Sequence, residues 1–134
     1  SRDIFIAGNS FTQKLADVLG LEFKAADALK INPDKERSDK MVAATEAVLA
    51  NLGAEIRTSF DYYESQSASS VVKIFLSGGA SKFPGLKDML ANLLSIEVEY
   101  WDPLKEIGVS VNIDSEKVKA KSTELAVAVG LGLR

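Results

Sequence analysis

Apolar residues recur at steps of three and four along most of the chain, a pattern that predicts a helix-rich domain. The longest stripe runs from about Asp34 to Glu64 and predicts one long helix, with Gly53 as a weak point or a close-packing site inside it. Gly20 is placed to end the first helix in a left-handed conformation. Four shorter helices are predicted: one with Ser10 as its N-cap, one over 22–29, one opening at Pro84 or Gly85, and one from Ser115 to Leu133.

Short apolar runs bounded by turn residues predict about three strands, at Ile4–Ala7, Val71–Leu76 and Ile96–Tyr100. The second run is nearly all apolar, which is typical of a strand covered on both faces. Strands alternating with helices predict an α/β arrangement with a mostly parallel sheet. Because a complete doubly wound sheet has five or six strands, we expect this sheet to be partial and the helices over 10–64 to form a separate subdomain. The stretch 108–114 is ambiguous.

The amino-acid composition excludes several classes of catalytic, metal and redox site. The chain has 134 residues, 46% hydrophobic and 26% charged, with a net charge of -3, which is sufficient for one self-supporting core. Because it contains no His and no Cys, Ser-His-Asp catalysis, Cys-His catalysis, a soft-ligand zinc site and a redox dithiol are excluded. The mild acidity argues against non-specific binding of nucleic acid. No apolar run is long enough to span a bilayer, so we expect any membrane role to go through a partner.

The turn after the second strand, Leu76–Ser81, is the best candidate for a ligand site. Its adjacent glycines, Gly78 and Gly79, let a ring or a phosphate lie against backbone amides at the carboxyl end of a strand. The alternative is that the glycines only permit a tight strand-to-helix turn. The spacing fits neither a dinucleotide fingerprint nor a P-loop.

Other polar and aromatic residues are weaker candidates for a functional role. Asp27 and Lys30 lie at i and i+3 on a short helix, so they could jointly meet a ribose and its phosphates, or form a solvated surface pair. The alternating charges of 34–40 indicate an exposed helix start. Tyr62 and Tyr63 are expected to cap the long helix against the core. Trp101 is expected to be a packing anchor, an interpretation that exposure would reverse in favour of a partner contact.

The segment Leu76–Leu86 (LSGGASKFPGL) resembles the adenosine-contacting turn of the actin-like ATPases. Further segments are similar, in order, to the second half of the PilM family, the cytoplasmic actin-like component of the type IV pilus assembly platform. These segments are Ile6–Thr12, Ala26–Lys30, Glu55–Tyr63 and Ala126–Arg134. The resemblance extends over nearly the full length. It implies one actin-like (ribonuclease H-like) lobe, an α/β fold with a partial mixed sheet in 1–9 and 71–134 and an inserted helical subdomain over 10–64.

The resemblance also implies a ligand and a partner. Gly78, Gly79 and Ala80 would line the adenine and ribose side of an ATP cleft, which Asp27 and Lys30 would close from the helical subdomain. The family usually has Glu where Asp27 stands and Gly where Ala7 stands. The phosphate-binding turns, the Asp residues that hold Mg²⁺ and the lobe that binds the membrane partner PilN would precede Ser1.

The expected function is therefore that of an ATP-binding lobe, inactive alone and without catalytic residues of its own, in a cytoplasmic protein held at the bacterial inner membrane through partners. An FtsA-like division domain or a GspL-like type II secretion domain would share this plan. A ligand-free protein-docking module that uses the long helix remains a further alternative. A Rossmann-like oxidoreductase is the least supported, because the glycine spacing is wrong and His is absent.

Overall fold

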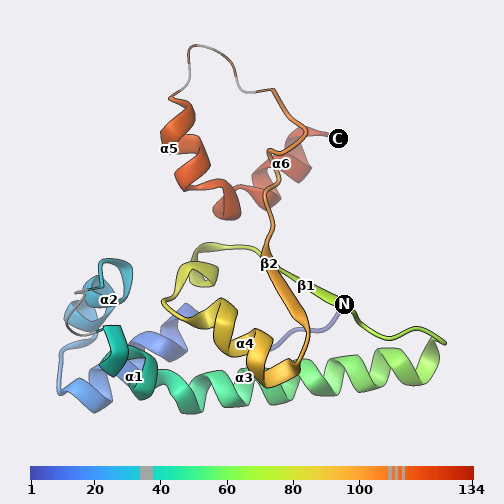
Figure 1. Cartoon of the computed structure of the whole chain (residues 1–134). Helices are drawn as coiled ribbons and strands as arrows, with labels where there is room; N and C mark the ends of the chain where they lie inside the picture. The colour runs from blue at the N-terminus through green and yellow to red at the C-terminus, as the bar shows by residue number, and fades with distance from the viewer. Residues whose placement is uncertain (34–37, 109, 111, 113) are drawn as a thin grey trace.

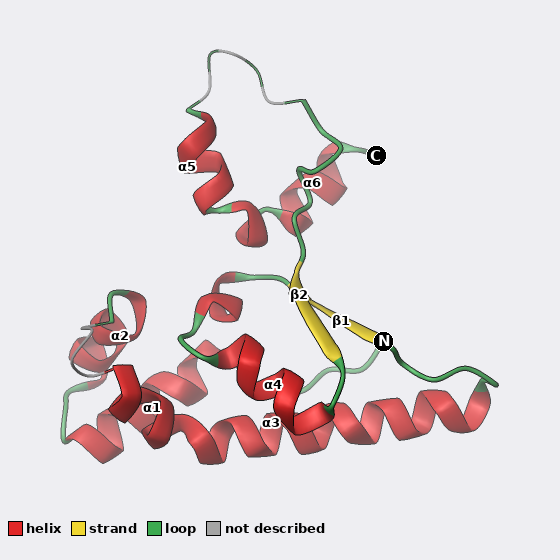
Figure 2. Cartoon of the chain, in the orientation of Figure 1, coloured by secondary structure: helices red, strands yellow, loops and turns green. Residues whose placement is uncertain are grey.

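A computed structural model describes residues 1–33, 38–108, 110, 112 and 114–134. Figures 1 and 2 show a largely helical chain with one short parallel sheet at its centre. The elements, in chain order, are α1 (Gly8–Leu19), α2 (Phe23–Ile31), α3 (Ser38–Gln66), β1 (Lys73–Leu76), the 3-10 turn η2 (Gly79–Lys82), α4 (Leu86–Leu94), β2 (Glu97–Tyr100), α5 (Ser115–Ala120), the 3-10 turn η3 (Ser122–Glu124) and α6 (Ala126–Gly132).

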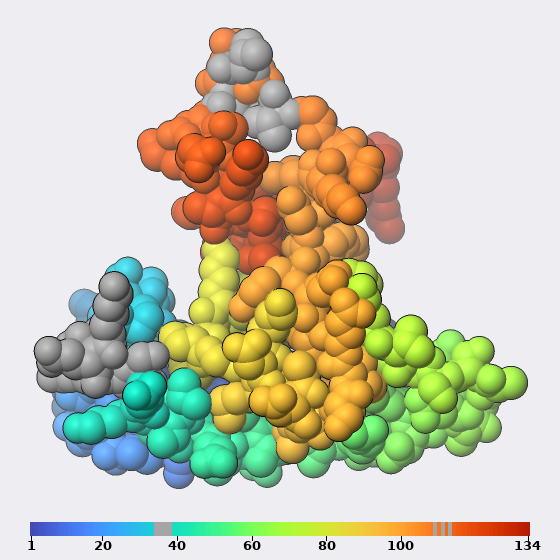
Figure 3. Space-filling view, viewed as in Figure 1, coloured from blue at the N-terminus to red at the C-terminus, as the bar shows by residue number. Residues whose placement is uncertain are grey.

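Helix α3 forms the base on which α1 and α4 pack, and α4 in turn packs against β2 (Figure 1). In the space-filling view (Figure 3), the C-terminal part that carries α5 projects from this body. The core lies between α3 and the elements above it, since that is where the apolar stripes of the helices meet. Its buried apolar residues are Phe11, Leu15, Ala16, Ala26, Met41, Ala44, Leu49, Phe83, Leu86, Leu90, Leu94 and Val98.

The sheet is parallel, as predicted, with Ile74 paired to Val98 and α4 as the crossover between the strands. The prediction that the strand within Val71–Leu76, now β1, is covered on both faces is wrong for the described residues. Helix α4 packs against the face that carries Ile74 and Val98, whereas Phe75 on the other face is 56% exposed. That second face instead carries ion pairs from Lys73 to Glu97 and Glu99.

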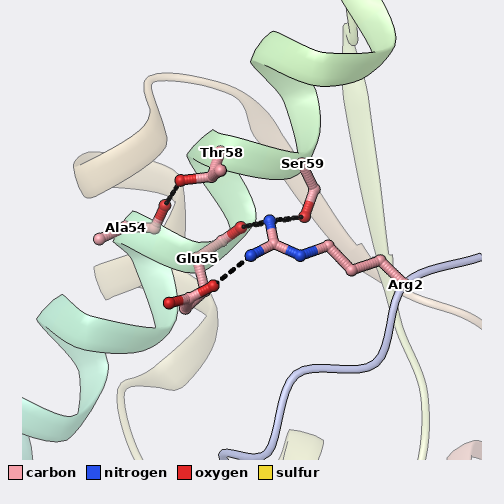
Figure 4. Close-up of polar contacts among 5 residues, drawn as sticks. All are labelled: Arg2, Ala54, Glu55, Thr58 and Ser59. Carbon is pink, nitrogen blue, oxygen red and sulfur yellow. Dashed lines mark hydrogen bonds and ion pairs between the residues drawn. The ribbon is translucent and has the colours of Figure 1, made fainter.

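The predicted strand Ile4–Ala7 is also wrong, because residues 1–7 lie outside any helix or strand and Phe5 is 97% exposed. A strand needs a neighbour to pair its backbone groups, and in the described part of the chain β1 and β2 pair only with each other. Arg2 holds this segment against α3 (Figure 4). Its guanidinium forms an ion pair with Glu55 and donates to the Ser59 hydroxyl at 2.9 Å.

Two glycine predictions are confirmed. Gly20 ends α1 at a φ of 64°, and its N–H donates to the carbonyl of Ala16. Gly53 is a close-packing site, since a Cβ there would lie 2.0 Å from Leu93 Cδ2. Helix α1 begins at Gly8 rather than after Ser10, whose hydroxyl instead accepts from the N–H of Ala7.

The predicted C-terminal helix is broken into α5, η3 and α6. The break frees the carbonyl of Thr123, which accepts from the N–H of Gly78 at 2.6 Å and from the Ser77 hydroxyl at 3.1 Å. A continuous helix would have used that carbonyl internally. The C-terminal segment therefore docks on the glycine turn through backbone groups.

The predictions that Tyr62, Tyr63 and Trp101 pack against the core are wrong as well. Tyr62 and Tyr63 are 67% and 50% exposed, so they do not cap α3 against the core. Trp101 is 53% exposed rather than a buried anchor. The charged run 34–40 falls mostly, and the ambiguous stretch 108–114 partly, outside the described residues.

Candidate functional site

A cleft of about 490 Å³ opens where three distant parts of the chain meet. The first turn of α1 and the inner side of α2 form one wall. The turn after β1 forms the second wall, and the segment around η3 forms the third. The lining residues are Gly8, Phe11, Asp27, Lys30, Ile31, Gly79, Ala80, Lys82, Phe83, Lys121 and Glu124.

Lys30 is the centre of the first wall. Its ammonium donates to Asp27 Oδ1 at 2.7 Å, to Thr12 Oγ1 at 2.7 Å and to the carbonyl of Gly8 at 3.2 Å. The Thr12 hydroxyl in turn lies 3.0 Å from Asp27 Oδ1. A Cβ at position 8 would stand 3.5 Å from Lys30 Nζ, an ordinary van der Waals distance, so the first turn of α1 lies directly against the ammonium. The i and i+3 spacing on α2 thus places both charges on the cleft side of the helix.

The glycine turn forms the second wall. Gly78 has a φ of 89°, a conformation that L side chains rarely adopt, and its carbonyl accepts from the Ser81 hydroxyl at 2.6 Å. Gly79 and Ala80 follow in η2 and present almost no side chain to the cleft. Below them, the rings of Phe11 and Phe83 pack with centroids 5.0 Å apart, which gives this wall an apolar floor.

The third wall is tied to the second by Lys82. Its ammonium donates to Glu124 Oε1 at 2.8 Å and to the carbonyl of Ala120 at 2.6 Å. Because Lys82 and Glu124 are 42 residues apart, this contact depends on the fold rather than on local spacing. Lys121 lines the same side.

The cleft is weakly cationic. Three lysines face two carboxylates among its lining residues. The hydrogen bond from Lys30, followed by that from Thr12, lowers the pKa of Asp27 below its usual value. The hydrogen bond from Lys82 likewise lowers the pKa of Glu124. Both carboxylates are therefore ionised at neutral pH, and the excess ammonium favours an anionic ligand.

The structure brings together four of the five residues predicted for the site: Asp27, Lys30, Gly79 and Ala80 line one cleft. Gly78 is not among the lining residues and instead shapes the turn. Sequence reasoning missed Thr12, Lys82, Lys121 and Glu124. Thr12 and Lys82 lie within the segments Ile6–Thr12 and Leu76–Leu86 that carry the family resemblance, whereas Lys121 and Glu124 lie outside all such segments.

The two carboxylates that line the cleft are both paired with lysines, so the lining residues alone do not suit a metal ion. In the described ranges, no three acidic side chains lie close enough together to hold a metal ion. A wider groove of about 720 Å³ lies between α1 and α3, and it is lined by alanines and other apolar residues together with Lys14, Lys40 and Glu46. Over the same ranges, no helix has the length and apolar character needed to cross a membrane.

The fold and the cleft define a helix-rich α/β domain with a glycine turn and a cationic pocket at the carboxyl end of a parallel strand. The family model described as type IV pilus assembly protein PilM matches residues 1–134. A solved structure titled PilM-PilN type IV pilus biogenesis complex is similar at 30% identity with a TM-score of 0.84. That match covers 99% of this chain and 38% of the other chain. The search of curated proteins found no match.

Because the family model extends over the whole chain, the chain belongs to the PilM family of type IV pilus assembly proteins. This membership supports the pilus assembly prediction over the FtsA-like and GspL-like alternatives.

Proposed function

We propose that residues 1–134 form the ATP-binding lobe of a longer, actin-like protein of the type IV pilus assembly platform. The observation that carries the proposal is the convergence of Asp27, Lys30, Gly79 and Ala80 on one weakly cationic cleft in a chain of the PilM family. These residues were predicted from separate segments of the sequence. Their meeting supports a shared ligand better than an incidental turn.

The cleft has the size and the donor set for the adenosine part of ATP. Its volume of about 490 Å³ falls within the usual range of small-molecule sites. Gly79 and Ala80 leave the backbone open to a flat ring, and the Asp27 carboxylate can accept hydrogen bonds from ribose hydroxyls. The ammonium groups of Lys82 and Lys121 would offset phosphate charge.

The rest of the machinery is proposed to lie outside these residues. Phosphate-binding turns and the Asp residues that hold Mg²⁺ would come from the remainder of the protein, since this cleft pairs its carboxylates with lysines. The matching structure is titled as a complex of PilM with PilN. We therefore propose a PilN-like membrane partner, bound through the other lobe, that holds a cytoplasmic protein at the inner membrane.

The substitution Gly79→Glu in the full-length protein tests the site. A Cβ at position 79 would be 3.9 Å from Glu124 Cγ, and the backbone there needs no positive φ, so the side chain fits without strain. It would place a third carboxylate in the space proposed for adenosine. We expect isothermal titration with ATP and Mg²⁺ to give an affinity at least about tenfold weaker, the loss expected when binding energy falls by about 1.4 kcal/mol.

Gly108→Glu is the matched control, because it introduces the same charge at an exposed glycine with open space around it. It should leave the ATP affinity unchanged, and circular dichroism should match the parent for both variants. Unchanged affinity in Gly79→Glu would disprove the site. Failure of the unaltered protein to bind ATP would disprove the function and favour the ligand-free docking module.

A further inference from the structure

A second cavity, of about 510 Å³, lies between the exposed face of the sheet, the loop after β2 and α6. It shares no lining residue with the proposed ATP cleft. Its walls are aromatic: Phe75, Tyr100 and Trp101 line it and remain 56%, 46% and 53% exposed. Helix α6 contributes small and apolar residues, including Val129 and Gly130, to the opposite side.

The charged side chains that line this cavity are mostly acidic. Three carboxylates line it, from Glu99, Asp102 and Glu106, against the one ammonium of Lys105. Glu99 also forms an ion pair with Lys73 at 3.3 Å, and the hydrogen bond from that lysine is the main cause of its lowered pKa. Asp102 uses Oδ1 to accept from the N–H of Leu104 at 3.0 Å, which leaves its other oxygen for a ligand.

Two aromatic rings at this site already attract cations of the chain itself. Lys73 Nζ lies 5.8 Å from the ring centroid of Phe75, and Lys87 Nζ lies 5.7 Å from that of Tyr100. Trp101 has the strongest cation–π face of the three residue types. Within the residues that the structure describes, no such lysine or arginine contact is found for its ring.

We propose that this cavity binds an arginine side chain from a basic segment of a partner protein. A guanidinium can stack on the Trp101 indole while its N–H groups reach the carboxylates of Asp102 and Glu106, a combination for which its planar fork is suited. Partially exposed Trp and Tyr side chains around a pocket are typical of the residues that dominate binding energy at interfaces. The charge complementarity favours a basic segment over an acidic one.

The indole N–H of Trp101 provides the assay. In the full-length protein, its NMR signal is assigned by its loss in Trp101→Phe. Titration with the peptide acetyl-Gly-Gly-Arg-Gly-Gly-amide should move this signal to saturation. The same peptide with citrulline, which keeps the shape of arginine but removes its charge, should move it about two- to fivefold less at equal, subsaturating concentration, the range expected for an exposed charge contact.

Asp102→Asn with Glu106→Gln tests the carboxylates while retaining the bond to the Leu104 N–H. We expect this double variant to weaken the arginine peptide by about two- to fivefold for each charge removed. Glu46→Gln, an exposed acid on α3, is the matched control and should bind like the parent. The proposal is overturned if the indole signal does not move, if both peptides move it equally, or if the double variant binds like the parent. It is also overturned if the signal moves with protein concentration alone, because a second copy would then occupy the cavity.

Discussion

At the contact between Gly53 on α3 and Leu93 on α4, these two helices lie close together. We predict that the substitution Gly53→Ala lowers the free energy of unfolding when Leu93 is present and raises it when Leu93 is replaced by alanine. A Cβ added at Gly53 would lie 2.0 Å from Leu93 Cδ2 and 3.0 Å from its Cγ, both too short for real side chains. Leu93 is 48% exposed, so it can rotate away from the new methyl group, at a cost in packing. Overpacking of this kind costs about 1 to 3 kcal/mol.

The substitution Gly53→Ala also makes a favourable contribution to the free energy of unfolding. Replacing glycine by alanine inside a helix stabilises it by about 1 kcal/mol. With Leu93 present, Gly53→Ala should therefore destabilise the protein by up to about 2 kcal/mol. In a Leu93→Ala background the clash is removed, and Gly53→Ala should instead stabilise by about 1 kcal/mol. The coupling between the two sites is then about 1 to 3 kcal/mol.

Urea denaturation followed by far-UV circular dichroism measures all four members of this cycle. Gly130→Ala is the matched control, because Gly130 lies inside α6 with open space around its would-be Cβ. It should stabilise by about the same amount in both backgrounds. If Gly53→Ala has the same effect in the parent and in the Leu93→Ala background, the α3–α4 contact is not as close as the structure has it and the reasoning fails.

Two further predictions concern the core and the cleft. Leu90 is 1% exposed, so Leu90→Ala should destabilise by about 2 to 5 kcal/mol in the same urea assay, and a loss below about 1 kcal/mol would contradict its place in the core. The pKa of Asp27 is lowered from 3.8, so its ion pair with Lys30 contributes stability above that pH and loses it as the pH falls through the lower, folded value. As the pH is lowered through the acid range, the melting temperature of Asp27→Asn should therefore fall less than that of the parent. Identical dependence of the melting temperature on pH in the two proteins would refute the role of this pair.

Local patterns predicted the elements whose partners are near in sequence. Helix α3 and the parallel pairing of β1 with β2 follow from apolar periodicity and from a single crossover helix. The close approach at Gly53 was also readable, since a glycine inside a long helix indicates a tight contact. In the cleft, the spacing of Asp27 and Lys30 and the glycine pair were enough to select them as candidates.

The remaining features depend on contacts that sequence spacing does not encode. Ile4–Ala7 has the composition of a strand, but the described residues offer it no neighbour to pair with. The predicted C-terminal helix is broken at η3, where the carbonyl of Thr123 binds the turn at Gly78, 45 positions earlier in the numbering. Lys82 and Glu124 meet only after that docking has occurred. The course of the C-terminal segment and the third wall of the cleft therefore depend on long-range contacts that the periodicity of the sequence does not reveal.

The hydrogen bonds of Lys30 distinguish its role in the proposed site from the roles of Lys82 and Lys121. An ammonium has three donors, and Lys30 uses them on Asp27, Thr12 and the carbonyl of Gly8. A phosphate could bind it only by displacing one of these acceptors. In the proposed site Lys30 would therefore position Asp27, whose remaining lone pairs would be available to a ribose, while Lys82 and Lys121 would offset the phosphate charge. Of those two, Lys82 is already paired with Glu124, and for Lys121 the described residues supply no ion pair. As far as the described residues go, Lys121 is accordingly the lysine of the cleft that could meet an anionic ligand without first breaking an ion pair.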